Sequence, residues 1–540
     1  MYQDHLAPEE LPWFRDRTRA NPPPFQLVNK ISSRRPDATS FRSLAFFPWT
    51  VESLHTLWQG SLRDQDASLW KKTISEFADA VAIGSRDSMY VFFVKTKRNP
   101  ICVTLPSEPD LRILPPDCMN VAWSLSPHAL DEPMLIFSRG SLLYIYNVVR
   151  KGIASYLRGH GGTITSIVVH PVTANLFCTT SRDYSTRIYD ITLPPQREPK
   201  NPHWPPSKKP SLAGAAHGLH MTEPEGNGLG RCIVVLMGGR SGGHQAAVLG
   251  AAFHPKLPII ATCGLDRTVK IWLIRPTSHD TIKREDKPLF SSARIHKARV
   301  LSIAWLLNHD DMLLAHSAPA VMRVKPTNPH NKETYLEPGE LTVFRWLGLD
   351  RFFPPGHEDT PRDTLKGCAS DYQESSSFKL ISISAFPEAR DQYTTARLQV
   401  YQSPTHDPMI LCTLPNASSF FIMNAAHLPP PKATPFPLDE PVFTAGLESI
   451  HLDDDDTDST RAAELKEENE RRARMRRLEL RPPELKAMGW EVPIGVPPEV
   501  VDNGAGLHCC AMGMEGSVIV GVGSKGTIWV WALDETGLST

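Results

Sequence analysis

Two sets of histidine, threonine, aspartate and aromatic residues recur at nearly the same spacing in this chain. In each set a Gly-His pair comes first. The aspartate follows its histidine by 23 residues in the first set and by 22 in the second, and the aromatic residue follows the aspartate by six. A histidine with a carboxylate and a hydroxyl is a combination that can activate a nucleophile. The two sets are His160, Thr179, Asp183 and Tyr189, and His244, Thr262, Asp266 and Trp272.

The repetition gives these residues a structural explanation. A Gly-His pair before a strand, an aspartate in a tight turn and an aromatic residue on the next strand are typical of a WD repeat, one four-stranded blade of a β-propeller. In the second copy we expect Asp266 in the turn between the strands of Thr262 and Trp272. The polar groups can then form a hydrogen-bonded chain from indole through hydroxyl and imidazole to carboxylate, which is stabilising only when every member has a partner. We therefore interpret both sets as structural rather than catalytic.

Short runs of alternating hydrophobicity, separated by Gly, Pro and Asp, continue on both sides of these repeats. They predict an all-β fold, a seven-bladed WD-repeat β-propeller with long loop insertions. The predicted blades begin near residues 41, 118, 160, 244, 296, 378 and 507. The fifth is degenerate: its third strand is expected at 320–326, with Ala318 and Val324 at the aspartate and aromatic positions. The sixth is expected to start with 378–386 and continue with 397–403.

The remaining segments predict an arm and three insertions. Residues 1–40 are expected to be an irregular N-terminal arm with one strand at 25–30, and residues 41–540 to form the propeller. Dense Pro and Gly in several stretches indicate long loops. The predicted insertions are 50–77, 194–230 and 428–500.

The last predicted insertion contains an acidic run, Asp453–Asp456, followed by a charged segment typical of a solvated helix. Glutamate and arginine side chains four residues apart support a helix here, and Pro482 and Pro483 end it. One interpretation is an irregular insertion with a charged, solvated helix. The other is a docking helix in which Arg471–Arg477 makes a weak contact with DNA or an acidic partner.

Composition narrows the class of protein. The 540 residues include 58 basic and 59 acidic side chains, a net charge of −1, which argues against a surface that coats nucleic acid generally. Nine cysteines without a C-x-x-C pair indicate free thiols in a reducing compartment. The N-terminal residues have no signal-peptide pattern, and no apolar run is long enough to span a membrane. We expect a soluble intracellular protein.

Other arrangements that could carry chemistry are weak. His508 and Cys510 can lie on one side of a strand, but two ligands do not make a structural zinc site. The GNGLGR stretch at 226–231 lacks the preceding strand and following helix of a dinucleotide-binding loop. We predict no metal, no cofactor and no enzymatic activity.

Several of these stretches resemble one WD-repeat family, the Polycomb EED/extra sex combs proteins. They are SRGSLLYIYNVVRKGIASYLRGHGGTITSIVVHP, TTSRDYSTRIYDI, VVLMGGRSGGHQAAVLGAAFHP, TCGLDRTVKIWLI and GSKGTIWVWAL. The resemblance implies a non-catalytic scaffold subunit of Polycomb repressive complex 2, a histone H3 lysine 27 methyltransferase. It implies that a helical segment of the SET-domain enzyme lies in a groove on one propeller face. It also implies action in the nucleus in gene silencing, other subunits of that complex as partners, and possible contact with the histone H3 tail.

The resemblance further implies an aromatic cage for trimethyl-lysine on the opposite face, where a cation contacts aromatic rings. Alignment on Ala122-Trp123 places Met119 at one cage position, and Phe41 lies near another. The family's adjacent Trp-Tyr pair is expected at 355–375, where Tyr372 lies with Phe353 just upstream. We predict that scaffolding is retained and that methyl-lysine reading is weakened or lost.

A second class of function remains open. A WD-repeat adaptor of another complex, such as a ubiquitin-ligase substrate receptor or an assembly factor, would use the same fold.

Overall fold

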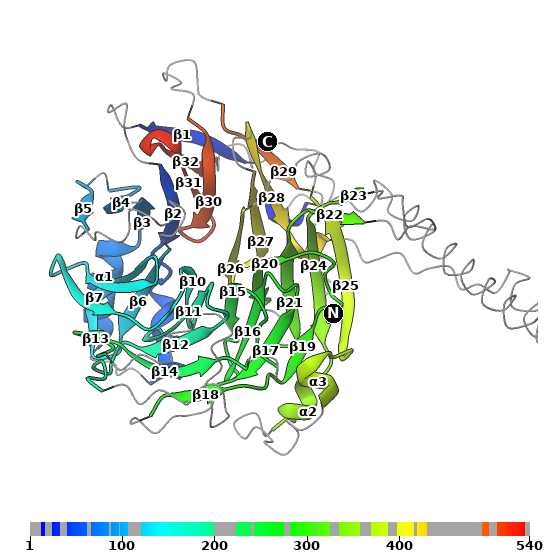
Figure 1. Ribbon diagram of the computed structural model, residues 1–540. Coiled ribbons are helices and arrows are strands. Elements are labelled where there is room, and N and C mark those ends of the chain that lie inside the picture. The colour runs from blue at the N-terminus through cyan, green and yellow to red at the C-terminus, as the bar shows by residue number, and fades with distance from the viewer. Residues whose placement is uncertain are drawn as a thin grey trace, which may run out of the picture.

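The computed structural model describes residues 12–16, 24–32, 40–61, 66–85, 88–96, 98–105, 120–198, 223–238, 242–274, 281–307, 309–323, 334–356, 369–386, 397–414, 418–428, 489–495 and 505–534. These residues form seven sheets of four or five strands set radially around a common centre, as Figure 1 shows. A further two-stranded hairpin stands apart from them. The predicted fold class, a seven-bladed β-propeller, is confirmed.

Each blade runs from an inner first strand to an outer fourth strand. The first three blades are β2 (Phe41–Phe46), β3 (Ala80–Ser85), β4 (Ser88–Phe93) and β5 (Ile101–Thr104); β6 (Val121–Ser126), β7 (Ala129–Arg139), β8 (Leu142–Asn147) and β9 (Gly152–Leu157); and β10 (Ile164–Val169), β11 (Leu176–Ser181), β12 (Thr186–Asp190) and β14 (Arg231–Leu236). The fourth and fifth are β15 (Val248–Phe253), β16 (Ile259–Gly264), β17 (Val269–Leu273) and β19 (Phe290–Ser292); and β20 (Val300–Trp305), β21 (Met312–Ser317), β24 (Glu340–Trp346) and β25 (Phe378–Ala385). The sixth is β26 (Arg397–Ser403), β27 (His406–Thr413), β28 (Ser419–Asn424) and β29 (Trp490–Pro493).

The seventh blade joins the two ends of the chain. Its strands are β30 (Leu507–Gly513), β31 (Val518–Gly523), β32 (Ile528–Leu533) and the N-terminal β1 (Phe25–Ile31). Because β1 pairs antiparallel with β32, the last blade takes its outer strand from the predicted N-terminal arm. Two short segments extend other blades: β13 (Gly226–Asn227) pairs with β9, and β18 (Lys283–Glu285) pairs in parallel with β14.

The two ends of the ring differ. First and second strands pair antiparallel, so the start of a first strand lies beside the end of a second strand, as Val248 lies beside Gly264. His244 precedes that first strand and Asp266 follows that second strand, so we call this the His/Asp end. The opposite end carries the connections from first to second strands and from third to fourth strands, and we call it the insertion end.

The predicted insertion after β2 is an ordered layer at the insertion end. It contains the 3-10 turns η3 (Glu52–His55) and η4 (Leu57–Gly60) and the helix α1 (Asp66–Phe77). Thr73 Oγ1 donates to the Leu130 carbonyl at 3.0 Å, and the Trp58 amide donates to the Val172 carbonyl at 2.9 Å. These contacts tie the first blade to the second and third.

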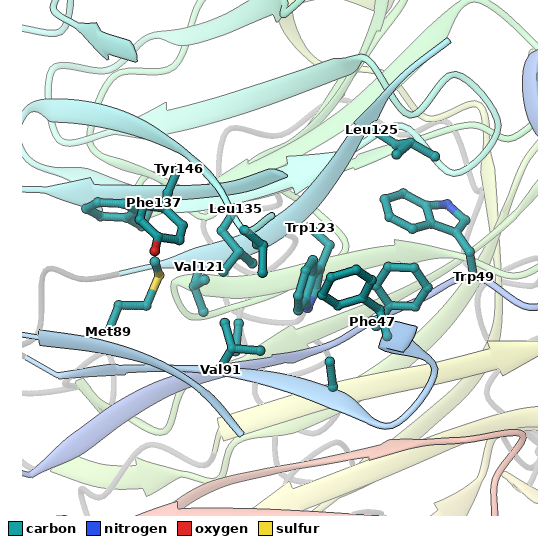
Figure 2. Close-up of a cluster of buried hydrophobic side chains, with 14 of the residues drawn as sticks. Phe47, Trp49, Met89, Val91, Val121, Trp123, Leu125, Leu135, Phe137 and Tyr146 are labelled. Atoms are coloured by element: carbon teal, nitrogen blue, oxygen red, sulfur yellow. The ribbon is translucent and has the colours of Figure 1, made fainter. Parts of the chain in front are cut away.

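The core lies between neighbouring blades. Figure 2 shows Phe47 of the first blade beside Trp123 of the second. Their ring centroids are 5.3 Å apart in an edge-to-face arrangement. The Trp123 indole N–H donates to the Ala45 carbonyl at 2.9 Å, which gives the buried ring its polar partner. Repetition of such interfaces around the ring holds each blade on two sides.

The fifth and sixth blades differ from the prediction. The segment expected as the third strand of the fifth blade, β22 (Ala320–Arg323), pairs with β23 (Thr334–Glu337) in the separate hairpin. The third strand is β24, and β25, which we assigned to the sixth blade, is the outer strand of the fifth. The prediction was wrong because local alternation cannot distinguish an inserted hairpin from a blade strand.

The boundary of the last predicted insertion is also corrected. β29 lies within 428–500 and is the outer strand of the sixth blade, pairing with β28. Asp453–Asp456 and Arg471–Arg477 lie outside the described residues. The remaining short elements are η2 (Trp13–Arg15), α2 (Leu349–Phe352), α3 (Ala369–Gln373), η8 (Ala425–His427) and η10 (Ser524–Gly526). Among the helices in the described part of the chain, none combines the length and apolar character needed to cross a membrane.

Candidate functional site

The fourth blade brings its four predicted polar residues into one chain of contacts. The Trp272 indole N–H donates to Thr262 Oγ1 at 2.8 Å, and Thr262 Oγ1 lies 2.8 Å from His244 Nε2. His244 Nδ1 lies 3.1 and 3.0 Å from the two carboxylate oxygens of Asp266. Since the indole can only donate, the partners are satisfied together when the threonine hydroxyl donates to Nε2 and Nδ1–H donates to the carboxylate.

Asp266 also organises the turn in which it lies. Its carboxylate accepts the Gln245 amide at 2.8 Å and the Thr268 amide and hydroxyl at 3.1 and 2.8 Å. Burial alone would raise the pKa of this carboxyl, but His244 and these hydrogen bonds outweigh burial and hold its pKa well below the usual range. The charged carboxylate therefore ties the loop before the first strand to the turn after the second.

The third blade repeats the arrangement. His160 Nδ1 lies 2.9 Å from Asp183 Oδ2, and His160 Nε2 lies 2.7 Å from Thr179 Oγ1. Tyr189 hydrogen-bonds to Thr179, and burial raises the pKa of its phenol. The Asp183 carboxylate also accepts the Gly161 amide at 3.0 Å. Thr179, Asp183 and Tyr189 are each at most 2% exposed, so a substrate has no access to them, and the arrangement fits a structural role.

The fifth blade keeps the histidine and lacks its partners. His296 lies four residues before β20, as His244 lies four before β15. It is 2% exposed, and neither ring nitrogen has a hydrogen-bond partner among the described residues. His316 of the neighbouring strand β21 is equally buried, with an unpartnered Nε2. The sequence predicted the start of this blade but not the buried pair His296 and His316. Which residues surround these histidines depends on the third strand, whose position was not predicted.

The residues proposed for a methyl-lysine pocket do not come together in the described contacts. Phe41 of the first blade is 8% exposed and packs on Tyr90, with ring centroids 5.6 Å apart. Phe353 is 3% exposed within the core between the fourth and fifth blades. Tyr372 lies on α3 with Lys287 Nζ 5.0 Å from its ring centroid. Met119 lies outside the described residues.

The physical reason is the displaced outer strand of the fifth blade. We expected the Trp-Tyr pair after a blade that ended near residue 325, but that blade ends with β25 at Ala385. The described helix α3, within the expected range 355–375, precedes the outer strand of the fifth blade and packs on β19 of the fourth blade. The segment that enters the sixth blade is 387–396, which lies outside the described residues.

Two arginines near the start of inner strands were not singled out by the sequence reasoning. The Arg397 guanidinium on β26 donates to the Arg42 carbonyl on β2 at 2.9 Å, across the seventh blade that separates their blades. The Cys509 thiol on β30 also donates to that carbonyl, at 3.5 Å. Both arginines lie at the first or second position of an inner strand. This shared position can be recognised only once the bounds of the strands are known.

Comparison with known proteins agrees with the fold. The family described as WD domain, G-beta repeat matches residues 152–190 and 230–272, which include both polar networks. Together with the seven-bladed ring, this defines the chain as a WD-repeat β-propeller. Its homologues include Polycomb proteins of plants and fungi. Polycomb group protein FIE1 of Zea mays is 27% identical over 159 residues, 29% of this chain and 26% of that protein. Polycomb protein EED of Chaetomium thermophilum is 26% identical over 199 residues, 36% of this chain and 28% of that protein.

The similarity in structure extends further than the similarity in sequence. A chain in the structure described as Chaetomium thermophilum Polycomb Repressive Complex 2 bound to GSK126 superposes with a TM-score of 0.53 at 16% identity, covering 94% of this chain and 98% of that chain. At this identity the likeness shows the shared fold alone. The sequence matches span about a quarter of the length of the curated relatives.

Proposed function

We propose that this chain is a non-catalytic scaffold subunit of a Polycomb-type histone H3 lysine 27 methyltransferase complex that acts in the nucleus. The observation that carries the proposal is the sequence similarity to Polycomb proteins of plants and fungi. The fold shared over nearly the whole ring is consistent with it. The buried networks add that the recurrent histidines and aspartates stabilise blades, which leaves the surfaces of the ring for binding.

The insertion end is the face on which we propose that a helical segment of the SET-domain enzyme docks. Four large apolar side chains exposed at this end come from first-to-second or third-to-fourth strand connections: Val51, Val149, Leu307 and Leu347, at 42%, 44%, 37% and 57% exposed. An amphipathic helix gains most of its affinity by burying such side chains. The ordered layer of η3, η4 and α1 on the same end gives the docking surface a rigid border.

The first experiment is affinity purification of the tagged full chain from nuclear extract with identification by mass spectrometry. We expect a SET-domain methyltransferase, with and without residues 429–488. Recovery of cullin-adaptor proteins instead would favour the ubiquitin-ligase alternative and contradict the proposal.

Substitutions at the insertion end locate the contact. Leu307→Asp with Leu347→Asp should reduce recovery of the SET-domain protein at least tenfold, because two apolar anchors are replaced by charges that must be desolvated. The matched control is Leu265→Asp, which alters a leucine 42% exposed at the His/Asp end and should leave recovery unchanged. Equal losses in both variants would place the contact elsewhere.

We also propose that this chain reads trimethyl-lysine weakly or not at all. Phe353 is a core residue and Tyr372 lies on α3, which packs on the fourth blade, so neither extends an aromatic surface from Phe41. Titration with a trimethyl-lysine histone H3 peptide should show no binding at low micromolar concentration. A dissociation constant in the low micromolar range would overturn this part of the proposal.

A further inference from the structure

The exposed charges at the His/Asp end are unevenly distributed. The turns after the second strands carry Arg182 in the third blade, Arg267 in the fourth and Lys525 in the seventh, all exposed. Arg299 is exposed directly before the first strand of the fifth blade. We define the basic rim as six basic residues at this end, three on or directly before first strands and three in turns after second strands: Arg42, Arg299 and Arg397, and Arg182, Arg267 and Lys525.

Strand register places these residues at one end of the ring. The first residue of β2 pairs with Ser85 at the end of β3, and Arg397 pairs with Thr413 at the end of β27. Arg42 is the bulged residue of β2, where the register shifts between Phe41 and Ser43. Six of the seven blades therefore contribute a cation to the same end of the ring.

Most carboxylates described at this end already have hydrogen-bond or ion-pair partners within the protein. Asp183 and Asp266 accept hydrogen bonds inside the buried networks. Toward the outside of the ring, acidic and basic side chains pair with each other: Glu223 with Arg158, Glu337 with Lys297 at 3.2 Å, and Glu374 with Arg294 at 3.6 Å. No ion pair joins Arg182, Arg267 or Arg299 to a carboxylate in the described part of the chain.

The insertion end has a different composition. Exposed lysines occur there, such as Lys71, Lys72 and Lys95, but exposed carboxylates accompany them: Glu52, Glu76, Asp131, Asp350 and Glu515. The near-zero net charge of the whole chain thus conceals a local excess of positive charge on one face.

We propose that the basic rim is a binding surface for the phosphate backbone of duplex DNA. A small anion cannot contact cations on six blades, whereas duplex DNA carries one negative charge per about 1.7 Å of helix axis and can engage several at once. Among the described residues, the large apolar side chains exposed at this end are Ile31, Leu265 and Val321, and none is an aromatic ring on which a base could stack. Contact with phosphates alone makes the binding independent of sequence.

The test measures binding of the full-length protein to a short labelled DNA duplex by fluorescence anisotropy over a range of salt concentrations. Arg182→Gln, Arg267→Gln and Arg299→Gln together should weaken binding at least tenfold. They should also lower the slope of log affinity against log salt by roughly 2 to 3, since each lost phosphate contact removes about 0.9. The matched control, Lys71→Gln with Lys72→Gln and Lys95→Gln, removes three exposed cations from the insertion end and should change neither quantity.

Thermal unfolding at the same midpoint as the unaltered protein shows that the triple variant is folded. Arg267 has φ +66°, a conformation that glutamine adopts no less readily than arginine. Unchanged affinity and salt slope in a folded triple variant would overturn the proposal. Equal weakening in the control or equally tight binding of a poly-glutamate peptide would also overturn it. So would complete loss of binding when only residues 459–480, the predicted charged helix, are removed.

Discussion

The fourth and fifth blades place a histidine at the same position and surround it differently. Around His244, the hydroxyl of Thr262 and the carboxylate of Asp266 occupy both ring nitrogens. In the fifth blade, register puts Ala315 where the fourth has Thr262 and Phe344 where it has Trp272. The turn that would carry an aspartate is replaced by the hairpin of β22 and β23.

The difference shows which part of the repeat the fold requires. The fifth blade lacks three members of the network and still forms a four-stranded sheet with its core closed, because Phe344 and its apolar neighbours are fully buried. Apolar packing between blades is therefore sufficient for the architecture. The polar network adds stability to individual blades, and its absence leaves His296 buried without compensation.

The largest effect expected from this difference is a dependence of stability on pH. Burial lowers the pKa of His296 to about 4, and burial together with the nearby His296 lowers that of His316 to about 3. In the unfolded chain both have pKa values near 6.5. Below about pH 6.5 the unfolded state therefore binds protons that the native state does not, and the free energy of unfolding falls as the pH falls.

For His296 alone the loss should reach roughly 3 kcal/mol at pH 4, from 1.36 kcal/mol for each pKa unit. Urea unfolding at a series of pH values measures it. The double variant His296→Leu and His316→Leu should remove much of the loss between pH 6.5 and 4. Asp266 provides an internal contrast. Because its pKa is lowered in the folded state, its contribution to stability is lost only below about pH 4, where an aspartate of the unfolded chain begins to bind protons. Parallel curves for the variant and the unaltered protein would contradict the assignment of buried neutral histidines.

The next effect concerns the completed network. Asp266→Ala should lower the free energy of unfolding by about 1–3 kcal/mol, because the His244 ring and the amides of Gln245 and Thr268 lose their acceptor. Leu265→Ala, in the same turn, should change it by less than about 0.5 kcal/mol, since this leucine is a surface residue, 42% exposed. An unchanged unfolding midpoint for Asp266→Ala would mean that the network contributes nothing to the blade.

The smallest effect separates the two histidines directly. His296→Leu at neutral pH should be neutral or stabilising by up to about 1 kcal/mol, because it removes polar atoms that have no described partner. His244→Leu should cost about 1–3 kcal/mol, because it leaves Asp266 and Thr262 without their shared partner. Chemical unfolding measures both costs. Equal losses in the free energy of unfolding at the two positions would show that the hydrogen-bond partners of His244 add no stability.

The sequence predicts a structural feature well when the residues that form it lie close together in the chain. The sets around His160 and His244 were recognisable because each falls within a short window of regular spacing. The seven blades could be counted for the same reason. The fifth blade was misassigned because its third strand lies beyond a hairpin insertion, at Glu340–Trp346, where local pattern does not indicate which strands pair.

The position expected for the aromatic pair of the candidate pocket depended on that same misassigned strand. Once the outer strand of the fifth blade moved to Phe378–Ala385, the expected position of the aromatic pair moved with it. The basic rim was not predictable because its residues come from six blades and converge only when the ring closes. Sequence spacing predicts contacts within one blade, whereas contacts between distant blades form only when the propeller ring closes.

The most direct measurement of the proposed scaffold role is mass spectrometry of histone H3 from cells that lack this protein. If the chain holds the methyltransferase in an active complex, trimethylation of lysine 27 should fall to background and return when the full-length chain is restored. Trimethylation at the normal level in cells without the protein would contradict the account.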